Sequence, residues 1–164
     1  SWIACIVVTI LLTEFILNFV IINANIPSGS MENTIMTNDK LIALRTSYWF
    51  NDPKRGDIII FKYPDDETEW FIKRVIALPG ETVLVKDGKV YINGSKKALS
   101  EPYIKEEPVE DFGPYKVPKN GYFVMGDNRN NSNDAREWET HYVSRDEVLG
   151  KAWFRYYPSI KVIK

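Results

Sequence analysis

Residues 70–92 read WFIKRVIALPGETVLVKDGKVYI and hold three short runs rich in Val, Ile, Phe, Tyr and Trp. Pro79-Gly80 and Asp87-Gly88 separate these runs, which is typical of strands joined by turns. Asp-Gly between apolar runs is the strongest short hairpin signal, because both central residues of such a turn favour positive φ. The stretch therefore predicts a strand over residues 70–78 and a hairpin over residues 82–92.

The same pattern continues on both sides of this stretch, from Asn38 onward. It predicts further strands over residues 40–44, 57–63, 122–125 and 150–157. Only Ser144-Arg145-Asp146-Glu147 has a helix-start signature, with Ser at the cap position and Glu three residues later, so any helix there is short. The soluble part is thus predicted to be mainly β, with a loop-rich excursion or small subdomain where prolines and acidic residues gather between Ser95 and Asn120.

An apolar run over Trp2–Ile22 precedes the strands, and its only polar residues are Thr9, Thr13, Glu14 and Asn18. A helix of roughly 20 such residues spans a bilayer core, so we interpret the run as a transmembrane anchor. A cleavable signal peptide, whose apolar region is shorter, is the alternative. A carboxylate in this zone is costly, and Glu14 can hydrogen-bond to Asn18 one turn on. Because the chain begins with Ser rather than Met, we expect a further segment upstream.

Composition argues against several classes of function. With 164 residues, 45% of them apolar, the chain can bury one core but hardly two full domains. Lys and Arg number 21 against 22 Asp and Glu and form no basic stripe, which argues against nucleic acid as a partner. Cys5, the single cysteine, lies in the apolar run, and one histidine with scattered carboxylates gives no metal-ligand spacing. We therefore expect neither a disulfide nor a metal site.

A candidate nucleophile follows the apolar run, because the block Pro27-Ser28-Gly29-Ser30-Met31 places Ser30 on a turn just outside the membrane. A serine needs a base that removes its proton, and a lysine can serve only if its amine is neutral. Lys73 lies in the predicted strand 70–78, where burial among apolar side chains lowers its pKa, while Arg74 should point to the opposite face. The structural alternative for Lys73 is an ordinary exposed strand lysine.

Two other arrangements fit the sequence less well. His141, the only histidine, could serve as the base of a Ser-His-Asp triad with an orienting carboxylate from Asp127, Asp134 or Asp146. It lies in the polar stretch 137–142, which suits an exposed loop. Cys5 is the alternative nucleophile, but it lies in the membrane segment, away from any base.

A second block, GDNRNNSNDAR at residues 126–136, follows the predicted strand 122–125 and indicates a turn-rich loop. Most of its polar residues are of the types that lock a loop by caps and ion pairs, namely Asp127, Asn128, Asp134 and Arg136. Ser132 is a candidate for a different task, because a lysine base needs a partner that aims its amine at the serine. We therefore interpret Ser132 as the orienter of Lys73.

With RGDIIIF at residues 55–61, the anchor and these blocks stand in an order that resembles type I signal peptidase over nearly the whole chain. The resemblance implies a membrane-bound serine endopeptidase with a Ser-Lys dyad and no cofactor. It implies that Ser30 is the nucleophile, that Lys73 is the general base and that Ser132 orients Lys73. The main-chain amide of Ser30 and the hydroxyl of Ser28 match the oxyanion hole of the family.

Other residues match family positions that support the site. Asp134 and Arg136 match a pair that holds the site without performing the chemistry, and Arg74 matches a position without a clear chemical role. The chain departs from the family pattern at Asn33, where Pro is common, and at Ala135, where Ser is usual. Asn33 is expected to loosen the turn that presents Ser30, and neither departure removes a catalytic group.

The resemblance also implies the architecture and the location. It implies a β-fold of two antiparallel sheets with a transmembrane anchor at residues 1–23, a catalytic core at 24–83 and 119–164, and a reduced second domain at 84–118. The reduced excursion and the lysine base are similar to the bacterial, Gram-positive-like branch. The expected location is the bacterial cell membrane, with a single pass and the catalytic domain on the extracytoplasmic side.

The substrate expected from the resemblance is an exported preprotein whose signal peptide is cut after Ala-X-Ala. The segment around the cut would lie extended along the strand that carries Lys73, as an added strand. A small pocket for the residue before the cut would be lined by Ile26, Pro27, Ser28, Met31, Ile35, Phe71 and Ile72. The lipid bilayer is the second expected partner, and we expect exposed rings of residues 48–50 and 153–157 to reach its interface.

Two alternative functions remain at the level of sequence. A self-cleaving Ser-Lys peptidase of the repressor type uses the same chemistry, but it carries a DNA-binding module and no membrane anchor. An inactive paralogue that serves as a membrane scaffold or as a pilus-assembly helper has no need of the pair Ser30 and Lys73. The sequence therefore favours the signal-peptide endopeptidase.

Overall fold

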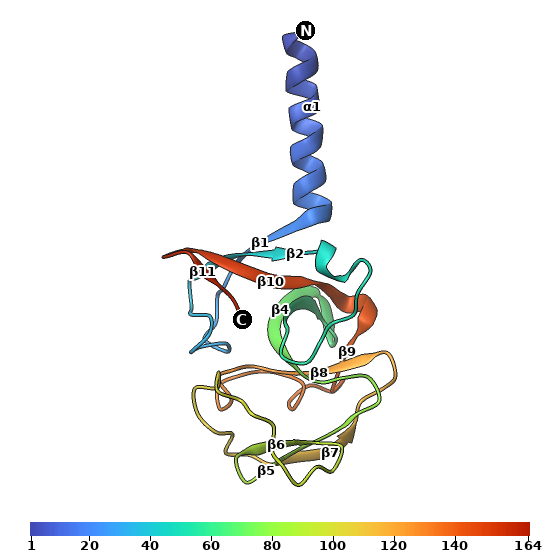
Figure 1. Cartoon of the computed structure of the whole chain (residues 1–164), viewed down its shortest axis with the longest axis vertical. Helices are drawn as coiled ribbons and strands as arrows, with labels where there is room; N and C mark the ends of the chain where they lie inside the picture. Colours follow the sequence, from blue (N-terminus) through green and yellow to red (C-terminus); the bar gives the residue numbers. More distant parts are fainter.

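The computed structural model describes all 164 residues, with one helix standing on a body of β-sheet (Figure 1). The α-helix α1 covers Trp2–Phe15 and continues as a π-helical turn at Ile16–Val20. None of these residues is buried against the protein. Their 19 residues measure about 28 Å at about 1.5 Å per residue, close to the thickness of a bilayer core. By length and composition, the helix can cross a membrane.

The helical segment ends earlier than we predicted. It stops at Val20, and residues 21–23, which we assigned to the anchor, begin strand β1 (Ile21–Asn25). Ile21 lies opposite Leu44, so the backbone N–H and C=O groups after the helix form hydrogen bonds with a neighbouring strand instead of with another helical turn. Within the helix, the side-chain amide of Asn18 donates to the Glu14 carboxylate at 3.1 Å, as predicted.

The large sheet is antiparallel and has the strand order β1-β2-β10-β3-β4-β8-β9, with β11 beside β10. After β1, its strands are β2 (Lys40–Leu44), β3 (Ile58–Tyr63), β4 (Asp66–Ala77), β8 (Gly121–Met125), β9 (Val143–Ser144), β10 (Val148–Tyr157) and β11 (Lys161–Val162). β4 pairs with β3 along its N-terminal part but with β8 only from Arg74 onward. No strand therefore pairs with the second edge of β4 before Arg74, next to Lys73.

A small sheet lies at the end of the molecule opposite α1 (Figure 1). Its strands are β5 (Thr82–Lys86), β6 (Lys89–Ile92) and β7 (Phe112–Lys116), in the order β6-β5-β7. The predicted hairpin is confirmed, with Asp87 and Gly88 at φ of 49° and 77° in its turn. The small sheet spans residues 82–116, so the boundary that we predicted at residue 84 falls inside β5.

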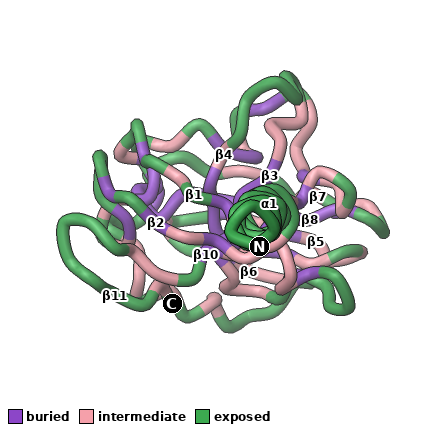
Figure 2. Tube along the Cα trace, turned by 90° about the horizontal axis from the view of Figure 1, so that it is seen from above, coloured by how far each residue is buried: buried purple, intermediate pink, exposed green.

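Two hydrophobic clusters form the core. The larger has 18 buried residues from both sheets, among them Phe61, Val75, Val83 and Phe123. The smaller has 10, gathered around β1, β2 and the turn after β1, and it includes Met31 and Ile35. Seen along α1, the exposed helix stands over a body whose buried segments lie beneath it (Figure 2). The smaller cluster thus holds the turn that carries Ser30 against the large sheet.

The prediction of a mainly β fold is confirmed, and so are the bounds of β2, β5 and β6. β7 escaped prediction because Gly113-Pro114 lowers its strand propensity, and β1 because its residues continue the apolar run of the helix. β4 begins at Asp66 instead of Trp70, since its hairpin with β3 extends through polar residues. The short helix is confirmed as a 3₁₀ turn, Arg145–Glu147, capped by Ser144; a second 3₁₀ turn covers Thr46–Tyr48.

Candidate active site

Ser30 and Lys73 meet in the interior, although 43 residues separate them in the chain. The Lys73 Nζ donates to the Ser30 Oγ at 2.8 Å. Lys73 projects from the middle of β4, and Ser30 lies in the turn after β1, which is closed by a bond from the Glu32 amide to the Gly29 carbonyl. Lys73 is 4% exposed and Ser30 is 7% exposed, so the pair is shielded from bulk water.

The environment of Lys73 favours a neutral amine. Burial lowers the pKa of its amine to about 8, because the ammonium form loses its hydration, while the negative charge of Asp134 acts in the opposite direction. The ring of Phe71 lies 5.2 Å from the Nζ, and no carboxylate forms an ion pair with it. The prediction of an unusual, buried lysine is therefore confirmed, and the alternative of an exposed strand lysine is wrong.

The loop at residues 126–136 clamps the serine turn. The main-chain amide of Asn128 donates to the Ser30 carbonyl at 3.0 Å, and its side-chain amide donates to the Gly29 carbonyl at 3.0 Å. The hydroxyl of Ser28 lies 3.4 Å from the Ser30 Oγ. These contacts fix the backbone of the turn while the Ser30 hydroxyl faces Lys73.

Gly126 packs against the serine turn without room for a side chain. A Cβ at this position would lie 2.4 Å from the Ser30 carbonyl oxygen and 2.2 Å from the Ser132 hydroxyl. Ser132 therefore packs beside the serine turn, as its predicted role requires. Its hydroxyl is buried and has no hydrogen-bond partner, so the predicted bond to Lys73 is not formed in this structure.

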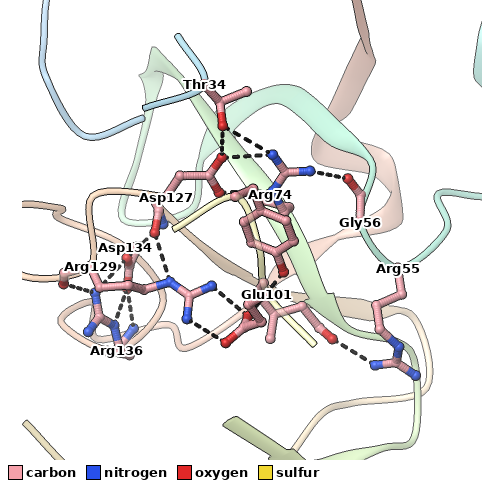
Figure 3. A network of polar contacts seen from close by, with 12 residues as sticks. Thr34, Arg55, Gly56, Arg74, Glu101, Asp127, Arg129, Asp134 and Arg136 are labelled. Carbon is pink, nitrogen blue, oxygen red and sulfur yellow. Dashed lines mark hydrogen bonds and ion pairs between the residues drawn. The ribbon is translucent and has the colours of Figure 1, made fainter. Parts of the chain in front are cut away.

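Asp134 and Arg136 form an ion pair with two hydrogen bonds within the loop (Figure 3). The Arg136 Nε and Nη2 each lie 2.9 Å from an oxygen of the Asp134 carboxylate, which is fully buried. The same carboxylate accepts from the Gly126 amide at 2.9 Å. The pair thus ties the residue beside Ser30 to the rest of the loop, and it contributes the one charge that acts on Lys73.

Arg74 points to the face of β4 opposite Lys73, as predicted, and it pairs with Asp127 (Figure 3). Its Nε and Nη2 donate to the Asp127 carboxylate at 2.9 and 2.7 Å, and its Nη1 donates to the Gly56 carbonyl at 2.8 Å. Thr34 donates to the same carboxylate, and the Tyr103 ring stacks 3.8 Å from the guanidinium. Arg74, for which the sequence indicates no clear chemical role, therefore links β4 to the loop at 126–136 and to the proline-rich excursion.

A second pair of this network was not found by sequence reasoning. Arg129, fully buried, donates to both oxygens of Glu101 at 3.0 and 2.7 Å and to the Gly126 carbonyl at 3.0 Å (Figure 3). Glu101 lies in the proline-rich excursion, where no pattern in the sequence marks it. The excursion therefore contacts the loop of the site directly.

The two departures from the family pattern both have structural partners. Asn33 has φ of 87°, which a proline cannot adopt, and its side-chain amide donates to the Tyr103 carbonyl at 2.9 Å. The expected loosening of the turn is thus offset by a tie to the excursion. Ala135 is fully buried, and its carbonyl lies 2.7 Å from the His141 Nδ1.

His141 does not reach the candidate nucleophile. Its ring packs against Phe112 and Tyr115 of β7 and hydrogen-bonds to the loop backbone, and no bond joins it to Ser30. Two of the carboxylates that could orient it, Asp127 and Asp134, are occupied by arginines. The alternative Ser-His-Asp triad is therefore not assembled.

A cleft of about 380 Å³ opens beside the pair of Ser30 and Lys73. Five of the predicted pocket residues line it: Ile26, Pro27, Ser28, Phe71 and Ile72. The other two, Met31 and Ile35, are each 1% exposed and lie in the smaller core cluster beneath, because the turn folds them inward. The cleft is completed by residues that we did not predict, namely Gly29, Glu69, Trp70, Asn131 and Asn133.

Comparison with known families agrees with this geometry. The sequence pattern of the family described as "Signal peptidase, peptidase S26" matches residues 1–157. The chain belongs to this family. It is therefore a peptidase, and the match covers the anchor, both sheets and the loop of the candidate site. An inactive scaffold and a self-cleaving repressor are correspondingly disfavoured.

Named relatives extend the similarity to individual signal peptidases. The chain is 44% identical over 161 residues to the probable signal peptidase I-2 of Synechocystis sp., covering 95% of this chain and 72% of that protein. It is 34% identical over 174 residues to signal peptidase I of Bacillus amyloliquefaciens, covering 100% of this chain and 91% of that protein. The predicted resemblance to type I signal peptidase is thereby confirmed.

A solved relative supports the fold of this S26 peptidase. The crystal structure of a signal peptidase I from Enterococcus faecalis matches with a TM-score of 0.53 and 36% identity. The match covers 62% of this chain and 97% of that chain. The β-fold of the family is therefore shared by the part of this chain that aligns.

Proposed function

We propose that this chain removes signal peptides from exported preproteins, with Ser30 as the nucleophile and Lys73 as the general base. The observation that carries the assignment is the 2.8 Å contact between the Lys73 Nζ and the Ser30 Oγ in a buried setting. A buried lysine without a carboxylate partner is rare unless it has a chemical task, because its charge is costly there. The free edge of β4 beside the pair supports an extended peptide as substrate.

The geometry supports catalysis in two steps. Neutral Lys73 takes the hydroxyl proton while the Ser30 Oγ attacks the carbonyl carbon of the residue before the cut, which gives a tetrahedral intermediate. The resulting ammonium then protonates the leaving amine, the bond to the mature protein breaks, and an ester to Ser30 remains. A water molecule, deprotonated by Lys73, attacks the ester, releases the signal peptide and restores the serine.

The developing oxyanion needs hydrogen-bond donors, and two lie at the serine turn. The main-chain amide of Ser30 donates to no backbone carbonyl, and the Ser28 hydroxyl lies 3.4 Å from the Ser30 Oγ. We assign these two donors to the oxyanion hole. Each such donor contributes roughly 3 kcal/mol to the stabilisation of a transition state.

The cleft supports a preference for a small residue before the cut. Ile26, Pro27 and Ile72 crowd its apolar part, and Met31 and Ile35 fill the space beneath. A bulky side chain would have to displace this core, whereas Ala, Gly or Ser fits without displacement. We therefore propose Ala-X-Ala before the cut, with the segment extended along the free edge of β4.

The anchor and the exposed rings support a site close to the bilayer. α1 enters the sheet through β1, and the cleft begins at Ile26, directly after that strand. Trp49, Phe50 and Trp153 are 52%, 91% and 48% exposed on the β body, where the membrane interface would accommodate them. We propose a single-pass protein of the bacterial cell membrane, with residues 21–164 on the extracytoplasmic side and the small sheet at residues 82–116 as a reduced second domain.

The test is the cleavage of a purified preprotein with an Ala-X-Ala site by the full chain in detergent. We expect wild type to cut after the second Ala, as read by mass spectrometry of both products, and Ser30→Ala and Lys73→Ala to be silent. Ser95→Ala and Lys89→Ala, at exposed positions on the small sheet and its loop, serve as matched controls and should cut at the wild-type rate. A folded wild-type protein that leaves several preproteins intact would contradict the proposal.

A further inference from the structure

Arg45 differs from every other arginine in the chain, because it has no carboxylate partner. Each of the others forms an ion pair, and these are Arg55, Arg74, Arg129, Arg136, Arg145 and Arg155. The Arg45 Nε is buried from solvent and has no hydrogen-bond acceptor within the protein. A guanidinium offers five N–H donors in a rigid fork, so this side chain has unused binding capacity for a planar or tetrahedral anion.

The place of Arg45 in the fold sets its depth in the membrane. Its main-chain amide donates to the carbonyl of Val20, the last residue of the helical segment, at 2.9 Å. The segment from Trp2 to Val20 is about as long as a bilayer core is thick, so Val20 lies at the boundary between hydrocarbon and headgroups. Arg45 is consequently held in the headgroup layer, where phosphate groups are the main anions.

One aromatic ring lies against the Arg45 guanidinium, and two more exposed rings follow in the chain. The Arg45 Cζ lies 5.7 Å from the centroid of the Trp70 ring, which is 50% exposed. Trp49 and Phe50 follow a few residues later and are also exposed. Indole rings concentrate at the level of lipid headgroups, so these neighbours belong to the same layer as the guanidinium. The Arg45 side chain makes no hydrogen bond and no ion pair within the protein, so its N–H donors are free for an anion.

We infer that Arg45 binds the phosphate group of a membrane phospholipid at the surface where the anchor ends. The fork of the guanidinium matches two phosphate oxygens, and stacking on Trp70 holds the fork in place. Because Trp70 also lines the cleft, a lipid bound at Arg45 fixes the height of the cleft above the bilayer. Arg45 is thus a lipid-anchoring residue, separate from the machinery of Ser30 and Lys73.

The experiment is native mass spectrometry of the full chain released from micelles that contain phosphatidylglycerol, with the fraction of lipid-bound protein read at increasing activation energy. Arg45→Gln should bind about fivefold less phosphatidylglycerol than wild type, the effect of one basic residue at a membrane surface. Arg45→Lys should fall between the two, since it keeps the charge but loses the fork. Lys89→Gln, which removes one exposed charge from β6 at the far end, should equal wild type. Circular dichroism confirms that each variant is folded.

Three outcomes would overturn the inference. Equal lipid binding by Arg45→Gln and wild type would show that the guanidinium makes no lipid contact. Full rescue by Arg45→Lys would indicate diffuse attraction to a charged surface in place of a phosphate site. If lipid binding is unchanged while Arg45→Gln slows preprotein cleavage in phosphate-free detergent, the guanidinium serves the substrate instead. Failure of the proposed catalysis would not affect these readouts, because none of the lipid measurements depends on turnover.

Discussion

Lys73 and Arg74 are neighbours in β4, point to opposite faces and are both buried, yet their surroundings differ completely. Arg74 makes three hydrogen bonds of 2.9 Å or shorter, two to Asp127 and one to Gly56, and it stacks on the Tyr103 ring. Lys73 makes one hydrogen bond, to the Ser30 hydroxyl, and has no ion pair. An arginine keeps its charge at any ordinary pH, so burial requires a partner, whereas a lysine can give up its proton.

Arg74 is thus a cation that stabilises the fold, whereas Lys73 has the environment that a general base needs. The cost of burying Arg74 is offset by a buried carboxylate, and the result is a rigid joint between β4 and the loop at 126–136. The cost of burying Lys73 is not offset, and it appears as a pKa lowered to about 8. The same strand therefore supplies a clamp on one face and the proposed base on the other.

The largest expected effect is on activity. Lys73→Met should lower kcat by about 10⁴-fold or more, because the nucleophile loses its base. Arg74→Met should retain much more of kcat in the fraction of protein that stays folded, since the guanidinium does not touch Ser30 or Lys73. Single-turnover cleavage of an Ala-X-Ala preprotein measures both. Equal losses in the two folded variants would remove the distinction between base and clamp.

The stabilities of the same two variants should change in opposite directions. Arg74→Met should lower the free energy of unfolding by about 3–5 kcal/mol, because Asp127 is left buried and unpaired. Lys73→Met should raise it at pH 7 by about 3 kcal/mol, the equivalent of the lowered pKa of the lysine. In wild type, the unfolded state binds the extra proton between about pH 8 and the ordinary pKa of 10.5, so stability should rise with pH across this window. Urea titrations of each variant test the signs.

A smaller loss is expected where the loop approaches the turn. Gly126→Ala would bring a methyl group to 2.4 Å from the Ser30 carbonyl oxygen and 2.2 Å from the Ser132 hydroxyl, so the turn must shift. We expect a fall in kcat of roughly 10²-fold, since displacements of this size disturb the alignment of nucleophile and base. Kinetics and a thermal melt should be measured together. A variant with normal kcat would show that the turn tolerates the displacement.

A substitution at Ser132 distinguishes a role in orienting Lys73 from a role in packing the loop. Its hydroxyl has no partner here, so Ser132→Ala should leave the free energy of unfolding unchanged or slightly higher. If the hydroxyl reaches Lys73 once substrate is bound, kcat should still fall by roughly tenfold or more. A purely structural residue would show the reverse pattern, with reduced stability and a normal kcat in the folded protein.

The smallest effect concerns the charge at the mouth of the cleft. Glu69 is the one carboxylate in the cleft lining, has no ion pair and lies four residues from Lys73 on β4, roughly 13 Å along an extended strand. A substrate with Lys at the position that faces Glu69 should have a kcat/KM about 2–5-fold higher than a substrate with Glu there. In Glu69→Gln the two substrates should be cleaved with equal kcat/KM. Glu106→Gln, exposed on the excursion, is the control. An unchanged ratio in Glu69→Gln would place the substrate elsewhere.

Local patterns predicted most of this fold, and distant contacts account for what they missed. Alternating Val, Ile and aromatic residues identified β2, β5 and β6 with their bounds, whereas β7 was hidden by Gly113-Pro114. The blocks around Ser30 and Lys73 identified the pair that the structure brings together. Met31 and Ile35 had been placed in the pocket, but a side chain's direction depends on how a turn packs, and they lie in the core. The bond between Arg129 and Glu101 depends on how the excursion folds back, which no local pattern encodes.

The pH dependence of kcat/KM is the sharpest test of Lys73 as the base, because it reports the proton on Lys73 in the working enzyme. We expect cleavage of an Ala-X-Ala preprotein to rise with pH through an apparent pKa of about 8 and then to level off, because burial lowers the pKa of the Lys73 amine to about 8. A profile that stays flat from pH 6 to 10, in a protein that remains folded, would contradict a lysine base.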